Sequence, residues 1–326
     1  MFNFIISPIA NLLGMIMNFI FNMVHSIIPT GSLGFSIIFF TIVVRFILLP
    51  LMINQQKSMQ RMQKVQPQIQ KIQDKYKNKK DPEAQQKMSQ EMAALYQKNK
   101  VNPLGGCLPL LIQMPIIFAL FQVLRSPAVH IEQVGSIYTQ LAEQVMTIPN
   151  YSTILEGFLK GKAIRSFDPN SMDSVVMLLS QFHTFDWTQL LNQLGEIGTT
   201  MLTQMEGLIA QLQKMNFFLG INLTDTPGMT FPGILLPIIA GGTTYLSTKF
   251  GMTNNTQNKG KDKASESTAA QTQNTMMLMF PFLTAFMTYT LPAGLGLYWI
   301  TSNVFQIFQQ LAINKTLSSK KGKETS

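Results

Sequence analysis

The chain of 326 residues carries few charges: Asp, Glu, Lys and Arg make up 13% of it, while 46% of its residues are hydrophobic. About a quarter of a soluble domain is charged, so this composition argues against a soluble protein. The net charge of +9 does not indicate specific DNA binding, because the basic residues stand in blocks between apolar runs, as in membrane proteins. The single Cys107 excludes an intrachain disulfide framework, and the three histidines show no metal-ligand spacing, so we expect no cofactor.

The first element in chain order is an apolar helix, residues 1–28, that carries a narrow polar stripe. The stripe repeats at helical spacing and consists of Asn3, Ser7, Asn11, Asn18, Asn22 and His25. This pattern favours an amphipathic helix lying in the membrane interface, with a sixth spanning segment as the alternative. A cleaved signal peptide is disfavoured, since no Lys or Arg precedes the apolar run and no small-residue cleavage site follows it.

Five later stretches are apolar enough to cross a bilayer, which takes about 20 residues. They are residues 33–53, 104–124, 231–250, 276–292 and 294–313. The fourth stretch is short, and the tight Pro/Gly turn "LPAGLG" joins it to the fifth. The sequence therefore predicts an all-α integral membrane protein with five transmembrane helices.

The distribution of Lys and Arg predicts the orientation of these spans. Residues 54–103 hold 11 basic residues against four acids, whereas residues 125–230 hold five against nine. Further Lys residues occur in the loop 251–275 and in the tail 314–326. By the positive-inside rule the two basic loops and the tail are cytoplasmic, while 125–230 and the N-terminus are outside.

The cytoplasmic segment 54–103 has the pattern of an antiparallel helical hairpin. Apolar residues step by three and four along two seams, which are Met62, Val65, Ile69, Ile72 and Tyr76, then Met88, Met92 and Leu95. Asp81 followed by Pro82 fits the start of the second helix, and Pro67 should kink the first arm. A solvated loop that merely obeys the charge bias is the alternative.

The outer segment 125–230 gives a weaker signal. One helical seam is visible in it, formed by Met201, Met205, Leu208, Leu212 and Met215. We expect several helices packed on the outer face of the membrane, with solvated padding or a subunit contact as alternatives.

Four stretches resemble the YidC/Oxa/Albino family of membrane protein insertases. They are "FTIVVRFILLPL" (40–51), "SQEMAALYQKNK" (89–100), "VNPLGGCLPLLIQMPIIFALF" (101–121) and "LPAGLGLYWITSNVFQIFQQ" (291–310). The resemblance covers about 1–124 and 216–313, and leaves 126–215 without a recognised counterpart. It implies a multi-pass protein of the bacterial plasma membrane that takes nascent hydrophobic segments and releases them sideways into the lipid bilayer, alone or beside the Sec translocon. The hairpin and the basic tail are then expected to face the ribosome.

Arg45 is the residue on which a site can be built. It lies eight residues from the nearer end of its span, roughly 12 Å of helix, and no Asp or Glu occurs in any of the five spans. Exposed to lipid, the guanidinium would cost at least ~3 kcal/mol. The sequence therefore predicts a water-filled pocket inside the bundle, which the resemblance describes as a groove open to the cytoplasm and to lipid.

Other polar residues of the spans are candidates to line this groove. They are Thr41, Gln113, Thr284, Thr288, Tyr298, Trp299, Ser302, Asn303 and Gln306. For any one of them a helix–helix hydrogen bond is the commoner explanation, but their convergence with an unpaired arginine favours the groove. In this mechanism the groove shortens the apolar distance for a polar or acidic tail, and the substrate slides along spans three and five.

Two rival functions remain. In a channel or transporter Arg45 would be an anion site, but the loops are unequal and no internal repeat of the kind many transporters show is visible. An enzyme is less favoured, because the spans contain no His, Asp or Glu and no nucleophile–base pair. We therefore expect a non-enzymatic insertase.

Overall fold

The structure, a computed structural model, describes residues 2–77, 81–101, 108–162, 164, 166–194, 199–229, 231–252 and 268–324. Most of the predicted cytoplasmic loop 251–275 lies outside the described residues, over 253–267. The same holds for Cys107 and the other first residues of the predicted second span.

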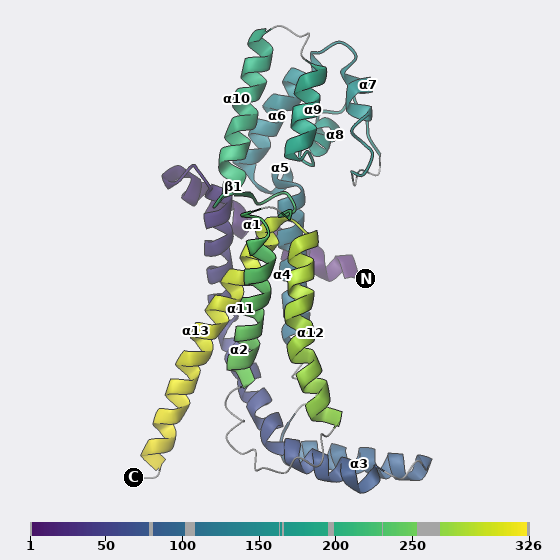
Figure 1. The fold of residues 1–326 in the computed structure, drawn as a ribbon, viewed down its shortest axis with the longest axis vertical. Helices are drawn as coiled ribbons and strands as arrows, with labels where there is room; N and C mark the ends of the chain where they lie inside the picture. Colours follow the sequence, from purple (N-terminus) through teal and green to yellow (C-terminus); the bar gives the residue numbers. More distant parts are fainter. Residues whose placement is uncertain are drawn as a thin grey trace.

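The described chain is a bundle of upright helices with a helical cap at one end and a hairpin at the other (Figure 1). The upright helices are α2 (Ser32–Tyr76), α4 (Leu108–Arg125), α11 (Leu235–Met252), α12 (Thr268–Thr290) and α13 (Ala293–Glu324). Helix α13 is central, because it packs against α2, α4, α11 and α12. It continues to Glu324, so the predicted basic tail is helical over most of its length.

Helix α1 (Phe2–Ile27) runs across the upright helices instead of along them (Figure 1). Its buried face, which includes Met17 and Phe21, packs on α2 and α4. Two residues of the polar stripe make contacts here: the side-chain oxygen of Asn18 accepts from the Glu132 backbone N–H at 3.0 Å, and His25 Nδ1 lies 3.2 Å from Ser32 Oγ. The stripe therefore also joins α1 to its neighbours.

Helix α2 runs without a break through the boundary at residues 53 and 54, so the predicted first span and the first hairpin arm are one helix. It contains Pro50 and Pro67, and Figure 1 shows it turning sideways below the bundle to lie along α3 (Pro82–Lys98). Proline is a common cause of such bends, because it cannot donate the backbone hydrogen bond.

The hairpin is held by a small apolar core of its own. Val65 and Ile69 of α2 are buried against Val101, with Met92 and Leu95 of α3 packed beside them. Pro82 is the first residue of α3, as expected for a helix start, but the Asp81 side chain makes no capping bond. The seams therefore face each other as an antiparallel hairpin requires.

The segment between α4 and the ribbon at residues 217–222 is a compact helical cap. Its helices are α5 (Pro127–His130), α6 (Glu132–Met146), α7 (Tyr151–Glu156), α8 (Met172–Leu179), α9 (Thr184–Gln193) and α10 (Thr199–Asn216). Met205 and Leu212, from the predicted seam, are buried in α10, and Trp187 of α9 packs on Phe182 with ring centroids 5.0 Å apart. The segment has a hydrophobic core and is not solvated padding.

The all-α prediction needs one correction. A short antiparallel ribbon pairs β1 (Phe217–Phe218) with β2 (Ile221–Asn222). It joins the cap to the start of α2, where the Phe218 ring occupies the space that a side chain at Gly34 would fill. Strands of two residues leave no alternating pattern in a sequence, so periodicity did not reveal them.

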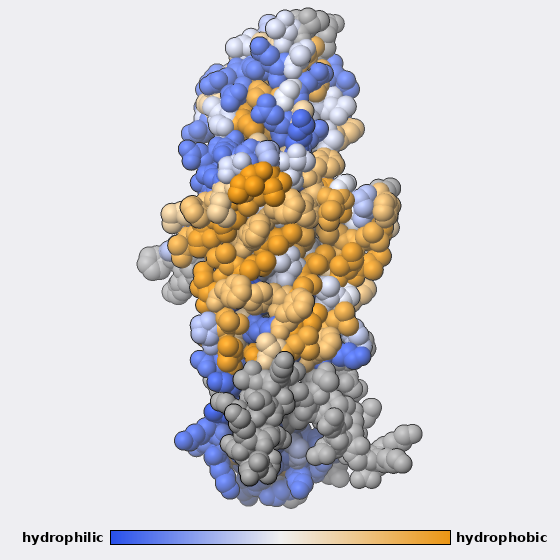
Figure 2. All heavy atoms as spheres, turned by 90° about the vertical axis from the view of Figure 1, so that its left-hand side faces the viewer, coloured by the Kyte–Doolittle hydropathy of each residue, from blue (hydrophilic) through white to orange (hydrophobic). Residues whose placement is uncertain are grey.

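On the face drawn in Figure 2, a hydrophobic band crosses the middle of the molecule between hydrophilic surfaces above and below. Exposed apolar side chains of the upright helices contribute to the surface, among them Phe46, Ile238, Phe286 and Phe308. Among the described residues, the length and hydropathy needed to cross a membrane are met by one helical segment, Ser32–Ser58. The middle of α11 contains the run "GGTTYLST", whose small and polar residues lower the mean hydropathy of this helix.

Candidate functional site

Arg45 lies inside the bundle, on the apolar part of α2, and is only 6% exposed. Its Nε donates to Ser302 Oγ of α13 at 3.0 Å, and Nη2 donates to the same oxygen. Its Nη1 donates to the Met52 sulfur at 3.4 Å. The guanidinium thus joins α2 to α13 through the Ser302 hydroxyl. Its other acceptor, the Met52 thioether, is weak and belongs to α2 itself.

No carboxylate neutralises this charge within the part of the chain that the structure describes. The four ion pairs there involve other cations, namely Lys75, Lys87, Lys162 and His183. A buried arginine normally binds a carboxylate or several carbonyl oxygens, because unpaired burial of a charge is costly. Arg45 therefore keeps a positive charge and donor capacity beyond its two protein acceptors.

A second polar link joins α4 to α13 beside the first. Gln113 Nε2 donates to the hydroxyl of Tyr298, which is buried one helical turn before Ser302. Thr41 is also buried, one turn before Arg45, and donates to its own helix at Ile37 O, 2.6 Å away. Of the predicted residues, Arg45, Ser302, Tyr298 and Thr41 are therefore buried, and Gln113 is half-buried.

Asn303 belongs to a separate polar contact with α11. Its amide nitrogen donates to Thr244 Oγ1 at 2.8 Å and Thr243 Oγ1 at 3.3 Å, and Ser247 Oγ lies 3.5 Å from its oxygen. Sequence reasoning missed the three α11 residues, although small polar residues at this helical spacing in a predicted span are a usable signal. Ser302 and Asn303 are adjacent in α13, but Ser302 contacts α2 and Asn303 contacts α11.

The remaining predicted residues are placed differently. Thr284 and Thr288 donate to carbonyls of their own helix, at 2.9 and 2.8 Å. Trp299 packs against the hydrophobic core, and Gln306 is exposed. Within the described residues, none of these four side chains forms a hydrogen bond with Arg45.

Polar contacts continue toward the hairpin end of the bundle. Gln56 of α2 donates to Gln310 of α13, and Gln55 and Gln310 are buried. These glutamines were not predicted, because Gln55 and Gln56 lie beyond the first predicted span and Gln310 lies near the end of the fifth, where polar residues are common.

Comparison with known proteins decides the family. The "60Kd inner membrane protein" family matches residues 23–321. This chain belongs to that family. Its members are polytopic proteins of the bacterial cytoplasmic membrane, which agrees with the hydrophobic band in Figure 2.

Three relatives named as insertases align with most of this chain. The chain is 32% identical over 323 residues to "Membrane protein insertase YidC" of Clostridium perfringens, covering 98% of this chain and 95% of the relative. It is 30% identical over 288 residues to the protein of that name from Oceanobacillus iheyensis, and this alignment covers 88% of this chain and 77% of the relative. It is 29% identical over 310 residues to the protein of that name from Fusobacterium nucleatum, and the alignment covers 95% of this chain and 98% of the relative.

These alignments correct the expected extent of the resemblance. The family match runs through residues 126–215, and the Clostridium perfringens alignment covers 98% of this chain. The helical cap therefore has a counterpart in relatives, although no motif in it was recognised.

Proposed function

We propose that this chain is a membrane protein insertase in which the residues around Arg45 receive nascent membrane proteins. Family membership and the names of its relatives support the general function. The single observation that supports the site is the buried guanidinium, which Ser302 and Met52 hold and which no carboxylate of the described residues pairs with. The proposal includes no enzymatic step.

Arg45 would act as a fixed charge partway across the apolar layer. A polar or acidic tail of a substrate can accept hydrogen bonds from a guanidinium that its protein neighbours leave incompletely used. In the low dielectric of the interior, the attraction for an acidic group is stronger than in water. The tail would thereby cross a shorter apolar distance.

The hydrophobic part of the substrate would leave along the apolar surfaces of α11 and α13. Ile238, Ile239 and Leu246 are exposed on α11, and Val304 and Phe308 are exposed on α13. Transfer of apolar area into lipid provides about 25 cal/mol per Å², so the step needs no nucleotide.

The topology belongs to the proposal. Five spans, built on α2, α4, α11, α12 and α13, would place the cap outside and the hairpin inside, with α1 along the outer interface. The basic hairpin and the end of α13 would then face the ribosome, and the Sec translocon is a further candidate partner. The charge bias of the loops supports this orientation.

The test compares Arg45→Ala, Arg45→Lys and Arg45→Glu in proteoliposomes, with pairs of single-span substrates that differ only in tail charge. Loss of a charged hydrogen bond is worth about 1.5–3 kcal/mol, so Arg45→Ala should slow insertion of acidic-tailed substrates about tenfold or more. Lys should retain part of the activity, because it retains the charge, and Glu should be worse than Ala. Protease protection of the substrate measures insertion.

Arg125→Ala is the matched control, since this arginine is exposed at the outer end of α4. The five-helix fold should survive Arg45→Ala, because Ser302 can bond back to its own helix. Equal losses for both tail charges, together with a lowered melting temperature, would show that Arg45 is structural and contradict the proposed site.

A further inference from the structure

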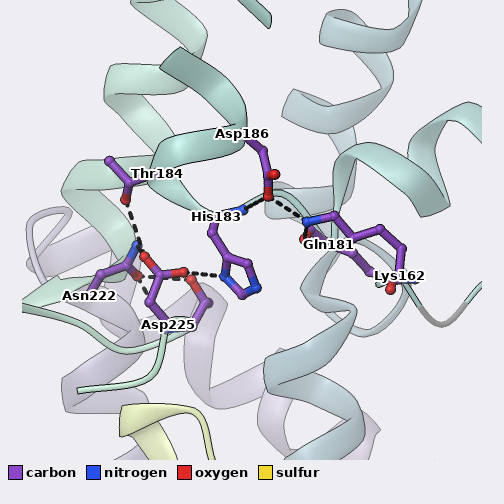
Figure 3. Close-up of polar contacts among 8 residues, drawn as sticks. Lys162, Gln181, His183, Thr184, Asp186, Asn222 and Asp225 are labelled. Atoms are coloured by element: carbon purple, nitrogen blue, oxygen red, sulfur yellow. Dashed lines mark hydrogen bonds and ion pairs between the residues drawn. The ribbon is translucent and has the colours of Figure 1, made fainter. Parts of the chain in front are cut away.

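The helical cap is hydrogen-bonded to the turn that precedes the upright helices α11 to α13. The residue of this turn that forms the bonds is Asp225 (Figure 3). Asp225 Oδ1 lies 2.6 Å from His183 Nδ1. Asp225 Oδ2 accepts from Thr184 Oγ1 at 3.2 Å and from Asn222 Nδ2 at 2.9 Å. His183 and Thr184 stand at the start of α9, so one carboxylate joins α9 to the segment after the ribbon.

The backbone of the same segment caps α13. The Ala293 N–H donates to Asp225 O at 2.8 Å, and the Gly294 N–H donates to Leu223 O at 2.9 Å. The first N–H groups of a helix have no partner within it, so these carbonyls supply a cap from outside the helix. On another side of the same turn, Gly294 allows α4 to pack closely, since an added Cβ would lie 2.8 Å from the Leu124 side chain.

The start of α9 is itself fixed to the core of the cap. The His183 N–H donates to Asp186 Oδ2 at 2.8 Å, and Lys162 pairs with Asp186 and donates to Gln181 O at 2.8 Å (Figure 3). Trp187, one turn further on, is buried in that core. The contacts to Asp225 therefore come from an anchored helix end.

A displacement of the first turn of α13 is transmitted along the helix to the candidate site. Tyr298 and Ser302 lie five and nine residues beyond Ala293, which is about 8 and 14 Å along the helix. A packed helix moves as a unit over such a distance, so a shift at Ala293 reaches the hydroxyl that holds Arg45.

We propose that the extracytoplasmic cap is a clamp on α13, in which His183 and Asp225 are positioning residues that set where Tyr298 and Ser302 stand relative to Arg45. Only the expected effect of the clamp on insertion rests on the proposed function. Its effect on the position of α13 is independent of what the protein does.

The clamp should respond to the pH outside the membrane. The charged groups that face His183 are Asp225, Asp186 and Lys162. The hydrogen bond to Asp225 raises the pKa of His183 above its ordinary value of 6.5, against the opposing effects of burial and Lys162. Because the pKa is raised, the contact contributes fully below pH 6.5 and weakens as the pH rises through the raised value.

The experiment uses the full chain in proteoliposomes, in a Cys107→Ser background, with nitroxide labels at the exposed positions Gln189 of α9 and Leu311 of α13. Distances between the labels and insertion rates are measured at pH 6 and pH 9. His183→Asn keeps an uncharged donor that does not titrate, and His183→Ala removes the link. His130→Asn is the matched control, another outer histidine, whose pKa burial lowers.

The unchanged chain and His130→Asn should show a narrow distance distribution at pH 6 that broadens at pH 9. One hydrogen bond contributes about 0.5–1.5 kcal/mol, so insertion should slow about two- to tenfold over this range. His183→Asn should show neither change, while His183→Ala should be broad and slow at both pH values. If His183→Ala does not fold, Asp225→Asn replaces it with the same expectation.

The clamp is overturned if His183→Asn responds to pH as the unchanged chain does, or if His183→Ala keeps the narrow distribution. If Arg45→Ala still impairs insertion in that case, the proposed function stands alone. If the unchanged chain inserts no more substrate than protein-free vesicles, the proposed function fails, and the label distances still decide the clamp.

Discussion

Ser302 shows how one hydroxyl can accommodate a charge inside an apolar bundle. It accepts from two nitrogens of Arg45, and it lies on a helix that contacts all four other upright helices. A serine makes a weaker acceptor than a carboxylate, so it positions the guanidinium without neutralising it. In the proposed site, this neutral partner would leave the charge available to a substrate.

Ser302→Ala should destabilise the folded protein by about 1–3 kcal/mol, because it removes an acceptor from a buried charged donor. Thr301→Ala is the matched control, since Thr301 is half-buried and its hydroxyl donates to its own helix, at Leu297 O, 2.8 Å away. Thermal unfolding in detergent measures both.

A double-mutant cycle with Arg45→Ala separates the bond from other effects of the Ser302 substitution. A coupling of about 0.5–3 kcal/mol is expected for residues in direct contact. Additive effects of the two substitutions would mean that the bond between Arg45 and Ser302 does not stabilise the fold.

At the scale of elements, apolar contacts hold the hairpin more firmly than charges do. Ile69 is 4% exposed in its core, whereas the ion pair between Lys75 and Glu91 is open to solvent. The hydrogen bond from Lys75 lowers the pKa of Glu91, so the pair is charged at neutral pH and is lost on acidification. Exposed pairs of this kind contribute little to stability.

Ile69→Ala should therefore open the hairpin, since truncating a buried isoleucine costs about 2–5 kcal/mol. Glu91→Gln should leave it closed. Hydrogen exchange of the α3 amides measures both variants. Equal exchange rates in the two would show that the apolar seam does not hold the arms together.

At the scale of the whole molecule, the hydrophobic band and the distribution of charges define an axis. The band separates the helical cap from the basic hairpin (Figures 1 and 2), and the cap is the segment with an excess of acids. The positive-inside rule then assigns the two ends to opposite sides of the membrane.

Single cysteines test this orientation in a Cys107→Ser background. Ser136 of α6 and Ser89 of α3 are both exposed, so neither is shielded by the fold. A cysteine at Ser136 should react with an impermeant maleimide in intact cells, and one at Ser89 only after lysis. The reverse labelling would refute the orientation that the charges predict.

The sequence by itself determined the features that local composition controls. Apolar runs gave the upright helices, steps of three and four residues gave the seams with Val65 and Met205, and Arg45 was identified as a charge without an acid in any span. These features could be predicted because periodicity reports which face of a helix avoids water.

Only the tertiary structure decided which neighbour each polar face meets. Ser302 reaches Arg45 from 257 residues away, while Asn303 beside it turns to α11 and Gln306 to the surface. The bond between His183 and Asp225 likewise depends on how the cap packs on α13. A sequence pattern gives each helix its apolar and polar faces, but the pairing of faces follows from the packing of all the helices at once, which no single segment encodes.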